Sequence, residues 1–280
     1  MTTCYINGKY KPISKSSVNI TDRGLQFGDG VYEVIAIYKD KLVDLNLHLK
    51  RLKLSLKKID LKINLSEKQI ENISLKIKKI NNLKMGIIYI QITRGNQSTR
   101  DHKYPKDLKP NIIIYSINKN LDKMELLASK GVKASLYPDI RWLRSDIKST
   151  SLLGNVMAAN FAKKNKTHES ILFDYDDNIT EGNSSSIWII KNNICYTHPV
   201  SYRILKGCTR DKLIKLLRTN NLQFKEKTFS TKSLLSADEV FMTSATNFIM
   251  PIVKIDKKKI SKGKPGPISL ALRKKYISAI

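Results

Sequence analysis

The sequence predicts a mixed α/β (α+β) protein with two lobes, and three observations support this fold class. Short β-branched runs, such as residues 86–93 and 111–117, alternate with segments of helical periodicity. The chain has 280 residues, enough for more than one hydrophobic core. A polar stretch at residues 118–123 follows a strand and is a candidate linker. We therefore expect an N-terminal lobe over residues 1–120 and a C-terminal lobe over residues 121–280.

The first lobe is expected to begin with a hairpin and a long strand. Asn7 and Gly8 stand between two short β-prone runs, a pair typical of a type I′ turn. A glycine-rich stretch at residues 21–33 leads into an expected strand at residues 31–38. Because a strand follows this stretch, it does not indicate a dinucleotide or P-loop site.

Two helices are expected next. Apolar residues recur at helical spacing over residues 47–59, and His48 and Arg51 lie off that apolar stripe. Ser66 and Gln69 have the spacing of a capping box, which predicts the start of the second helix.

A polar loop at residues 94–105 separates the strands expected at residues 86–93 and 111–117. It carries Arg100 and His102, two positions apart. An arginine with a histidine can bind a carboxylate. A surface loop of a basic protein often contains the same pair without any function.

The second lobe is expected to alternate strands and helices in the same way. The expected strands are residues 131–137, 170–174, 187–190, 194–197 and 238–243, with a hairpin at 255–260 and helices at 152–163, 211–218 and from 266 onward. The helix at residues 152–163 is expected to bury an apolar face. Its members are Leu153, Val156, Met157 and Phe161.

The stretch at residues 139–150 contains one lysine, Lys148. Apolar residues surround it, and Arg141 and Arg144 precede it. An amine among apolar neighbours and other cations favours its neutral form, which is a nucleophile. The plainer interpretation is one more solvated lysine in a lysine-rich chain.

Three further groups of residues suggest which cofactor such a lysine would bind. Glu181 is an acid in a glycine- and serine-rich turn. Gly207 and Thr209 precede a helix whose free N–H groups could bind an anion, although Thr209 could equally be an ordinary N-cap. The hydroxyls of residues 243–246 could serve the same anion. A lysine, an acid, an arginine and anion-binding groups are what pyridoxal 5′-phosphate needs.

The formal net charge of +27 by itself indicates nucleic-acid binding. Only 10 of the 51 basic residues are arginine, however, and the lysines are spread along the chain. Arginine is the residue that reads bases and grips phosphate with two bonds. The composition therefore disfavours a nucleic-acid-binding protein.

Further features of the sequence bear on where the protein is located and on whether it binds a metal ion. We find no apolar run long enough to cross a bilayer and no signal-peptide pattern. The three cysteines, Cys4, Cys195 and Cys208, are scattered and have no metal-site spacing. We expect a cytoplasmic protein that uses no metal ion.

Several stretches, taken together and in order, carry a family resemblance over nearly the whole chain. They are residues 27–33, 139–149, 152–155, 180–182, 196–199 and 207–210. With these motifs the chain resembles the class IV aminotransferases, and within them the members that act on D-amino acids. The resemblance implies a fold-type IV enzyme: two α/β lobes with pyridoxal 5′-phosphate between them, the lysine in the C-terminal lobe, and a homodimer.

The resemblance also implies roles for residues at the cofactor. Lys148 matches the lysine that forms the Schiff base and moves the proton at the substrate Cα. Glu181 matches the acid on the pyridine nitrogen, and Leu205 an apolar residue behind the ring. The expected phosphate ligands are Arg51, Thr209 and Ser244, with backbone N–H groups of Cys208 and Ala245.

For the substrate, the resemblance implies a carboxylate-binding group of Tyr32, Arg100 and His102, the last two reaching across the homodimer. The expected reaction is transamination between a D-amino acid, D-alanine above all, and a 2-oxo acid such as 2-oxoglutarate. A branched-chain L-amino-acid aminotransferase or an aminodeoxychorismate lyase on the same fold remains the alternative.

Overall fold

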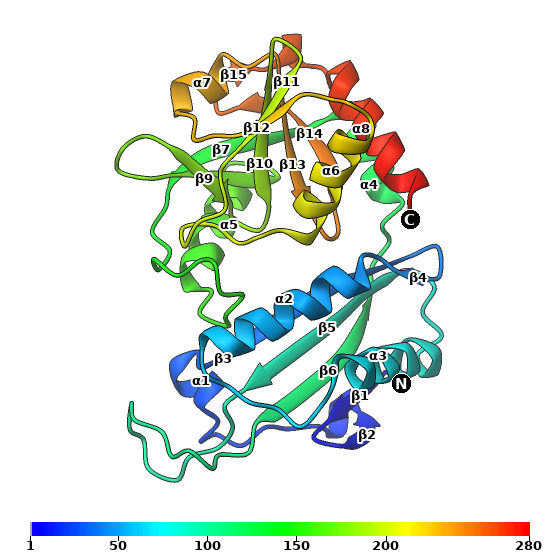
Figure 1. Ribbon diagram of the computed structural model, residues 1–280, viewed down its shortest axis with the longest axis vertical. Coiled ribbons are helices and arrows are strands. Elements are labelled where there is room, and N and C mark those ends of the chain that lie inside the picture. The colour runs from blue at the N-terminus through cyan, green and yellow to red at the C-terminus, as the bar shows by residue number, and fades with distance from the viewer. Residues whose placement is uncertain (1) are drawn as a thin grey trace. The chain divides into compact units, whose positions relative to one another are not determined.

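The structure is a computed structural model that describes residues 2–280, except for the side chain of Ser261. The chain forms two compact units (Figure 1). Unit 1 contains the described residues up to Asn120 together with Ile147–Ser151. Unit 2 contains Leu121–Asp146 and Leu152–Ile280. We had expected Lys148 in the C-terminal lobe, whereas its segment, Ile147–Ser151, groups with unit 1.

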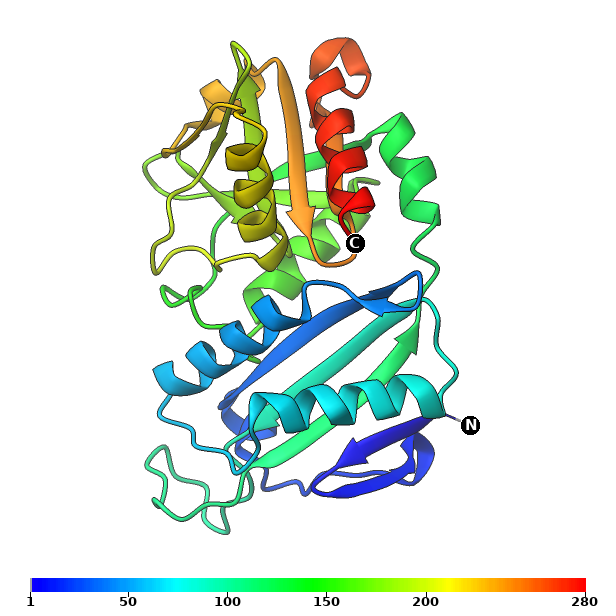
Figure 2. The ribbon, with the colours of Figure 1, turned by 45° about the vertical axis from the view of Figure 1, so that its right-hand side comes forward.

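Unit 1 is a six-stranded antiparallel sheet with two helices, α2 and α3, on one face (Figure 2). The strand order is β2-β1-β6-β5-β3-β4. The strands are β1 (Thr3–Ile6), β2 (Lys9–Pro12), β3 (Gly30–Tyr38), β4 (Lys41–Leu42), β5 (Gly86–Thr93) and β6 (Asn111–Asn118). The helices are α1 (Arg23–Phe27), α2 (Leu45–Lys58) and α3 (Glu67–Ile80), with a 3-10 turn, η1 (Ile13–Lys15).

Alternation along β3 explains how the sheet and α2 pack. Val31, Ile35 and Ile37 are fully buried on the face that contributes to the unit 1 core. Leu49 and Leu52 of α2 belong to the same core cluster. The predicted helical stripe at residues 47–59 is therefore confirmed as the inner face of α2.

Two local predictions in unit 1 are confirmed. Asn7 and Gly8 have φ angles of 48° and 89° and join β1 to β2, as a type I′ turn requires. The Ser66 hydroxyl accepts a hydrogen bond from the amide of Gln69, whose side chain in turn accepts one from the amide of Ser66. This capping box begins α3.

The short helix α1 was not predicted within the glycine-rich stretch. The Asp22 side chain caps it by accepting from the amide of Leu25, and Gly28 ends it in the left-handed region at φ 66°. A Cβ atom at Gly28 would also lie 2.5 Å from the hydroxyl of Ser151. Gly28 therefore serves both the turn and the close approach of the segment Ile147–Ser151.

Unit 2 is built on a nine-stranded mixed sheet, ordered β12-β11-β10-β13-β14-β7-β8-β9, with β15 paired to β14. The strands are β7 (Val132–Pro138), β8 (Glu169–Phe173), β9 (Ile179–Gly182), β10 (Ser186–Lys191), β11 (Ile194–Thr197), β12 (Phe224–Glu226), β13 (Glu239–Ser244), β14 (Phe248–Ile255) and β15 (Lys258–Lys259). The helices are α4 (Lys123–Lys130), α5 (Leu153–Lys164), α6 (Cys208–Thr219), α7 (Thr231–Leu235) and α8 (Pro267–Ser278), with a 3-10 turn, η2 (Ser261–Gly263).

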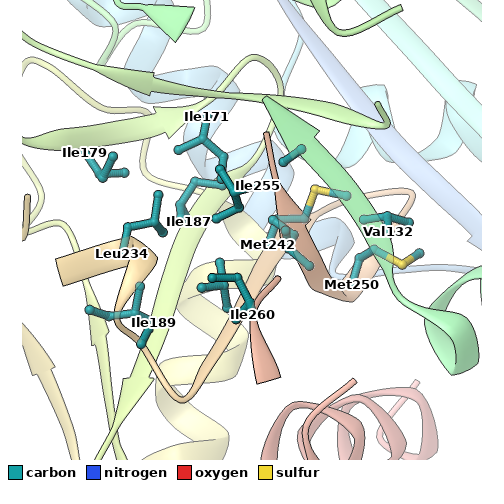
Figure 3. Packing of buried hydrophobic residues seen from close by; sticks show 14 of the residues in the cluster. Val132, Ile171, Ile179, Ile187, Ile189, Leu234, Met242, Met250, Ile255 and Ile260 are labelled. Carbon is teal, nitrogen blue, oxygen red and sulfur yellow. The ribbon is translucent and has the colours of Figure 1, made fainter. Parts of the chain in front are cut away.

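The unit 2 core lies on one face of this sheet (Figure 3). Leu234 of α7 packs there with Ile187 and Ile189 of β10. Alternate residues of β10 point the other way, so Trp188 is fully buried and stacks on Phe241 at 5.6 Å between ring centroids. Helices α6 and α8 lie side by side against β13. Both faces of the central strands are thus covered.

The prediction for the buried face of α5 is wrong for three of its four members. Leu153, Val156 and Met157 are 74%, 50% and 47% exposed. The small residues Ala158 and Ala162 are the buried ones. Small side chains let the helix backbone lie close to the sheet, so the large apolar side chains point outward.

Some elements had no prediction. Residues 118–123 were expected as a linker, and unit 1 ends within them at Asn120; helix α4, which had no prediction, begins at Lys123. Strand β14 was missed as well, although it is a continuous apolar run buried in the middle of the sheet. Among the described residues, no helix is both long and apolar enough to cross a membrane.

Candidate active site

The backbone of Lys148 is fixed at the edge of β3. The amide of Tyr32 donates to the carbonyl of Lys148 at 2.9 Å, and the amide of Thr150 donates to the carbonyl of Gly30 at 3.0 Å. The amide of Lys148 itself donates to the hydroxyl of Ser55 on α2 at 3.2 Å. The segment therefore pairs with the edge of β3 through an isolated antiparallel bridge between Val31 and Ser149, which explains its grouping with unit 1.

The side chain of Lys148 lies over an aromatic ring. Its Nζ atom is 4.1 Å from the ring centroid of Tyr32, a cation–π distance. The Tyr32 ring in turn stacks on Tyr89 at 5.8 Å. Two of the residues singled out in the sequence, Lys148 and Tyr32, are thus in contact.

The two arginines before Lys148 have carboxylate partners in unit 2. Arg141 pairs with Asp139 at 2.8 Å and with Glu181 at 2.6 Å. Arg144 pairs with Asp146 at 3.0 Å. Their charges are therefore balanced locally, and Arg141 serves the predicted acid Glu181.

Arg51 comes from the buried side of α2. His48, Arg51 and Ser55 are spaced i, i+3 and i+7, so they share one face of the helix. Arg51 and His48 both contact Glu33, a fully buried carboxylate of β3. The sequence analysis gave Glu33 no role, although it lies in the same short motif as Tyr32.

Arg100 and His102 lie together on the surface of unit 1. Both are exposed, and both contact the ring of Phe27. The guanidinium carbon of Arg100 is 4.8 Å from the Phe27 centroid, and the His102 ring is 5.4 Å from it. The structure thus brings together the two loop residues expected to bind a carboxylate.

Arg23 holds the loop that carries this pair, and sequence reasoning missed it. Its guanidinium donates to the side chain of Gln97 at 2.7 Å and to the carbonyls of Asp101 and His102 at 2.6 and 2.9 Å. Asp29 balances its charge at 2.9 Å. Because Arg23 is only 3% exposed, these bonds are shielded from water.

Glu181 is a buried acid at the end of β9. Burial raises its pKa, while the charge of Arg141, with a hydrogen bond from the same side chain and one from the Leu205 backbone, acts in the opposite direction. The Leu205 amide and the Arg141 guanidinium therefore hold the Glu181 carboxylate in place. This contact also positions Leu205 beside the acid.

A second buried acid, Glu169 of β8, lies near Glu181. Its carboxylate accepts a hydrogen bond from the amide of Ser184 at 3.0 Å. Burial raises the pKa of Glu169 to about 7, and the charge of Glu181 adds to that rise. The sequence gave no signal for this residue, because a glutamate at the start of a strand resembles an exposed one.

The first turn of α6 contains residues that the sequence analysis expected to bind an anion. Gly207 is the N-cap, and among the described residues no side chain caps this helix. Thr209 therefore lies inside the first turn and is not the N-cap, so that plainer alternative is wrong. Cys208 and Thr209 are both buried. Their N–H groups belong to the helix end where anions bind.

The end of β13, which Ser244 closes and Ala245 follows, is linked to this helix end through Ser186. A Cβ atom at Gly207 would lie 2.9 Å from the hydroxyl of Ser186, and Ser186 pairs with Thr243 at the end of β13. Ser244 ends that strand, and its hydroxyl accepts from the amide of Asn247 at 3.3 Å. The hydroxyls expected to share an anion with α6 thus lie near its first turn.

Each unit holds part of the predicted set. Unit 1 contains an amine, an arginine and a surface pair of arginine and histidine. Unit 2 contains a buried acid and a helix end flanked by hydroxyls. Within the described part of the chain, no three His, Cys, Asp or Glu residues cluster as metal ligands would.

Comparison with known proteins identifies a family. The family model described as amino-transferase class IV matches residues 30–255. A D-alanine aminotransferase of Bacillus licheniformis is 41% identical over 263 residues, covering 94% of this chain and 92% of that protein. A D-alanine aminotransferase of Staphylococcus aureus (strain MSSA476) is 38% identical over 283 residues, covering 100% of this chain and 99% of that protein.

The solved structures show the same fold at lower identity. The branched-chain amino acid aminotransferase of Escherichia coli has a TM-score of 0.90 at 22% identity, covering 99% of this chain and 93% of that chain. The branched-chain aminotransferase of the archaeon Thermoproteus uzoniensis, with norvaline, has a TM-score of 0.87 at 23% identity and the same coverage. This likeness establishes the fold, which is the two-lobed α/β fold expected from the resemblance.

Glu169 predicts a pH-dependent stability. A carboxyl group that binds its proton more tightly in the folded state stabilises the fold while protonated. This contribution is complete below the ordinary pKa of 4.5 and is lost as the pH rises through about 7. At about 1.4 kcal/mol for each tenfold change in proton affinity, the loss is at most about 3.5 kcal/mol.

Glu169→Gln should therefore lose less free energy of unfolding between pH 5 and pH 8 than the unchanged protein. Urea unfolding at both pH values measures this difference. Glu67→Gln, a change at a half-buried glutamate in the first turn of α3, is the matched control and should keep the full pH dependence. An equal loss in all three proteins would contradict the assignment.

Arg23→Gln should loosen the loop that carries Arg100 and His102. Hydrogen bonds to a charged group contribute roughly 1.5–3 kcal/mol each, so losing them should speed trypsin cleavage after Arg100 and Lys103 about tenfold or more. Timed digestion followed by mass spectrometry measures these cuts. Arg218→Gln, at an exposed arginine of unit 2, is the control. Unchanged cleavage in Arg23→Gln would show that the loop is held by other contacts.

Proposed function

Because the chain belongs to the class IV aminotransferases, we propose that it transfers the amino group of D-amino acids to 2-oxo acids, with pyridoxal 5′-phosphate as cofactor. D-alanine and 2-oxoglutarate are the proposed substrates. The observation that carries this proposal is the 38–41% identity to D-alanine aminotransferases over 94–100% of the chain. The branched-chain enzymes match at 22–23% identity, which supports a shared fold and leaves the substrate open.

The residues present fit this cofactor. The first turn of α6 has N–H groups and the Thr209 hydroxyl for a phosphate, with Ser244, Ala245 and Arg51 as the further proposed ligands. Glu181 is a buried acid whose carboxylate is oriented by Arg141 and can hold a proton on a ring nitrogen. Leu205, beside that acid, offers an apolar contact to the ring.

When bound, pyridoxal 5′-phosphate accepts the electrons left on the substrate Cα after its proton departs. Lys148 is proposed to carry the cofactor through its amine and then to take that proton and return it. The backbone hydrogen bonds at Tyr32 and Ser55 fix the base of this side chain while its four-carbon stem stays movable. A fixed backbone with a movable side chain suits an amine that must both hold the cofactor and move the Cα proton.

Tyr32, Arg100 and His102 are proposed to bind the substrate carboxylate. The carboxylate and the amine together fix which Cα substituent faces Lys148, and this geometry selects the D series. Arg100 and His102 are exposed on unit 1, so they are available to a second copy of the chain.

We further infer a homodimer. Unit 2 leaves several large apolar side chains open in two neighbouring stretches of sequence, and such patches mark contact surfaces. They are Ile140, Trp142, Leu143, Leu153, Val156 and Met157, which are 44–74% exposed.

Three free, buried cysteines support the proposed cytoplasmic location, where thiols stay reduced.

Lys148→Ala should reduce transamination of D-alanine with 2-oxoglutarate by at least about a thousandfold, since a positioned acid–base group contributes about 10²–10⁴ and the covalent link is lost as well. A coupled assay of pyruvate formation measures the rate. Lys57→Ala, at an exposed lysine of α2, should keep full activity. Normal turnover in Lys148→Ala would rule out this mechanism.

Two further assays separate the rival functions: L-leucine with 2-oxoglutarate, followed by the formation of the 2-oxo acid of leucine, and aminodeoxychorismate, followed by pyruvate release. Turnover of D-alanine alone supports the proposal. Turnover of L-leucine would make the chain a branched-chain aminotransferase, and pyruvate release from aminodeoxychorismate would make it a lyase. Both would keep the cofactor and the fold.

A further inference from the structure

A charged group lies inside the apolar core of unit 1. On the buried face of β3, Glu33 stands between Val31 and Ile35, and all three side chains have 0% exposure. Two residues of α2 reach it. His48 Nδ1 is 2.8 Å from one carboxylate oxygen, Oε2. Arg51 donates from Nε to Oε1 at 2.8 Å and from Nη2 to Oε2 at 2.9 Å.

Stability alone does not account for this group. Moving a carboxylate out of water costs several kcal/mol, and an apolar side chain of similar size often replaces a buried ion pair at no loss. Leucine or isoleucine at position 33 would continue the apolar row of β3. Burial by itself raises the pKa of Glu33, but the charge and hydrogen bonds of Arg51, together with those of His48, outweigh it and hold the pKa well below its ordinary value.

The contact geometry points to what the carboxylate does. Two parallel N–H···O bonds from one edge of a guanidinium fix both its plane and its direction. His48, one turn earlier on the same helix, fixes the shared oxygen Oε2 and so prevents the carboxylate from turning. An arginine held in this way loses little further freedom when it binds an anion.

We propose that Glu33 and His48 are positioning residues that orient the Arg51 guanidinium toward the phosphate of the cofactor. This inference rests on the proposed function, in which Arg51 is a phosphate ligand. Glu33 also brings a negative charge close to that phosphate, which by itself weakens binding. We expect orientation to outweigh this repulsion, because the Arg51 guanidinium lies directly against the Glu33 carboxylate and offsets its charge.

The test compares pyridoxal 5′-phosphate with pyridoxal, which lacks the phosphate. Both are titrated by absorbance into the full chain after its cofactor has been removed. Glu33→Gln keeps the size of the side chain but offers one acceptor oxygen in place of two. It should weaken pyridoxal 5′-phosphate about tenfold, the lower end of what outer contacts of a ligand-binding group contribute, and leave pyridoxal unchanged.

Two further variants secure the interpretation. His48→Asn keeps the Glu33–Arg51 pair and should weaken pyridoxal 5′-phosphate less, again without affecting pyridoxal; it also serves if Glu33→Gln does not fold. In an Arg51→Met background, Glu33→Gln should have no additional effect on the ratio of the two affinities. Such a double-mutant cycle isolates the action of Glu33 through Arg51.

Other outcomes are decisive as well. If Glu33→Gln and His48→Asn weaken both compounds equally, or leave the ratio unchanged, the buried group only supports the fold and the inference is wrong. Tighter binding of pyridoxal 5′-phosphate to Glu33→Gln would show that charge repulsion dominates, and would also overturn it. If the unchanged protein binds neither compound, the proposed function itself fails.

Discussion

The pairing of the Lys148 segment with the edge of β3 is the constraint on which the rest of unit 1 depends. Hydrogen bonds at Tyr32 and Thr150 make Ile147–Ser151 part of the sheet, although the chain on either side belongs to unit 2. The Ser55 hydroxyl of α2 completes the attachment. One helix therefore contacts the lysine segment through Ser55 and the buried Glu33 through Arg51. Because β3 and Ser55 both hold the backbone of Lys148, its flexible side chain starts from a fixed position.

Buried charge in this protein is arranged in compact groups that place an arginine directly against carboxylates. Arg141 lies with Asp139 and Glu181, and Arg51 with Glu33. Such groups cost desolvation energy, and they are tolerated only when each polar atom has partners. Both groups contain a residue proposed to contact the cofactor, Glu181 in one and Arg51 in the other. The large net charge of +27, by contrast, is carried by lysines spread along the chain.

Local patterns allowed much of the fold to be predicted. The Asn7–Gly8 turn and the Ser66 capping box depend on neighbouring residues only, and both were predicted correctly. The outward face of α5 was not, because apolar Leu153 and Val156 give the same periodicity whether they face a core or a partner. Arg23 was missed for a related reason: its contacts to the loop are 74–79 residues away in sequence, and no local pattern encodes them. The family resemblance assigned roles to the candidate site residues, and the structure showed which side chains contact them.

Lys148 is the residue proposed to carry the cofactor. The most direct measurement is borohydride reduction of the protein loaded with pyridoxal 5′-phosphate, followed by peptide mapping. Reduction makes the link to an amine permanent, and the chain offers 41 lysines (51 basic residues less 10 arginines). We predict one labelled peptide, with the modification on Lys148 and its loss after prior addition of D-alanine. Label on another lysine, or label spread over many, would contradict the account.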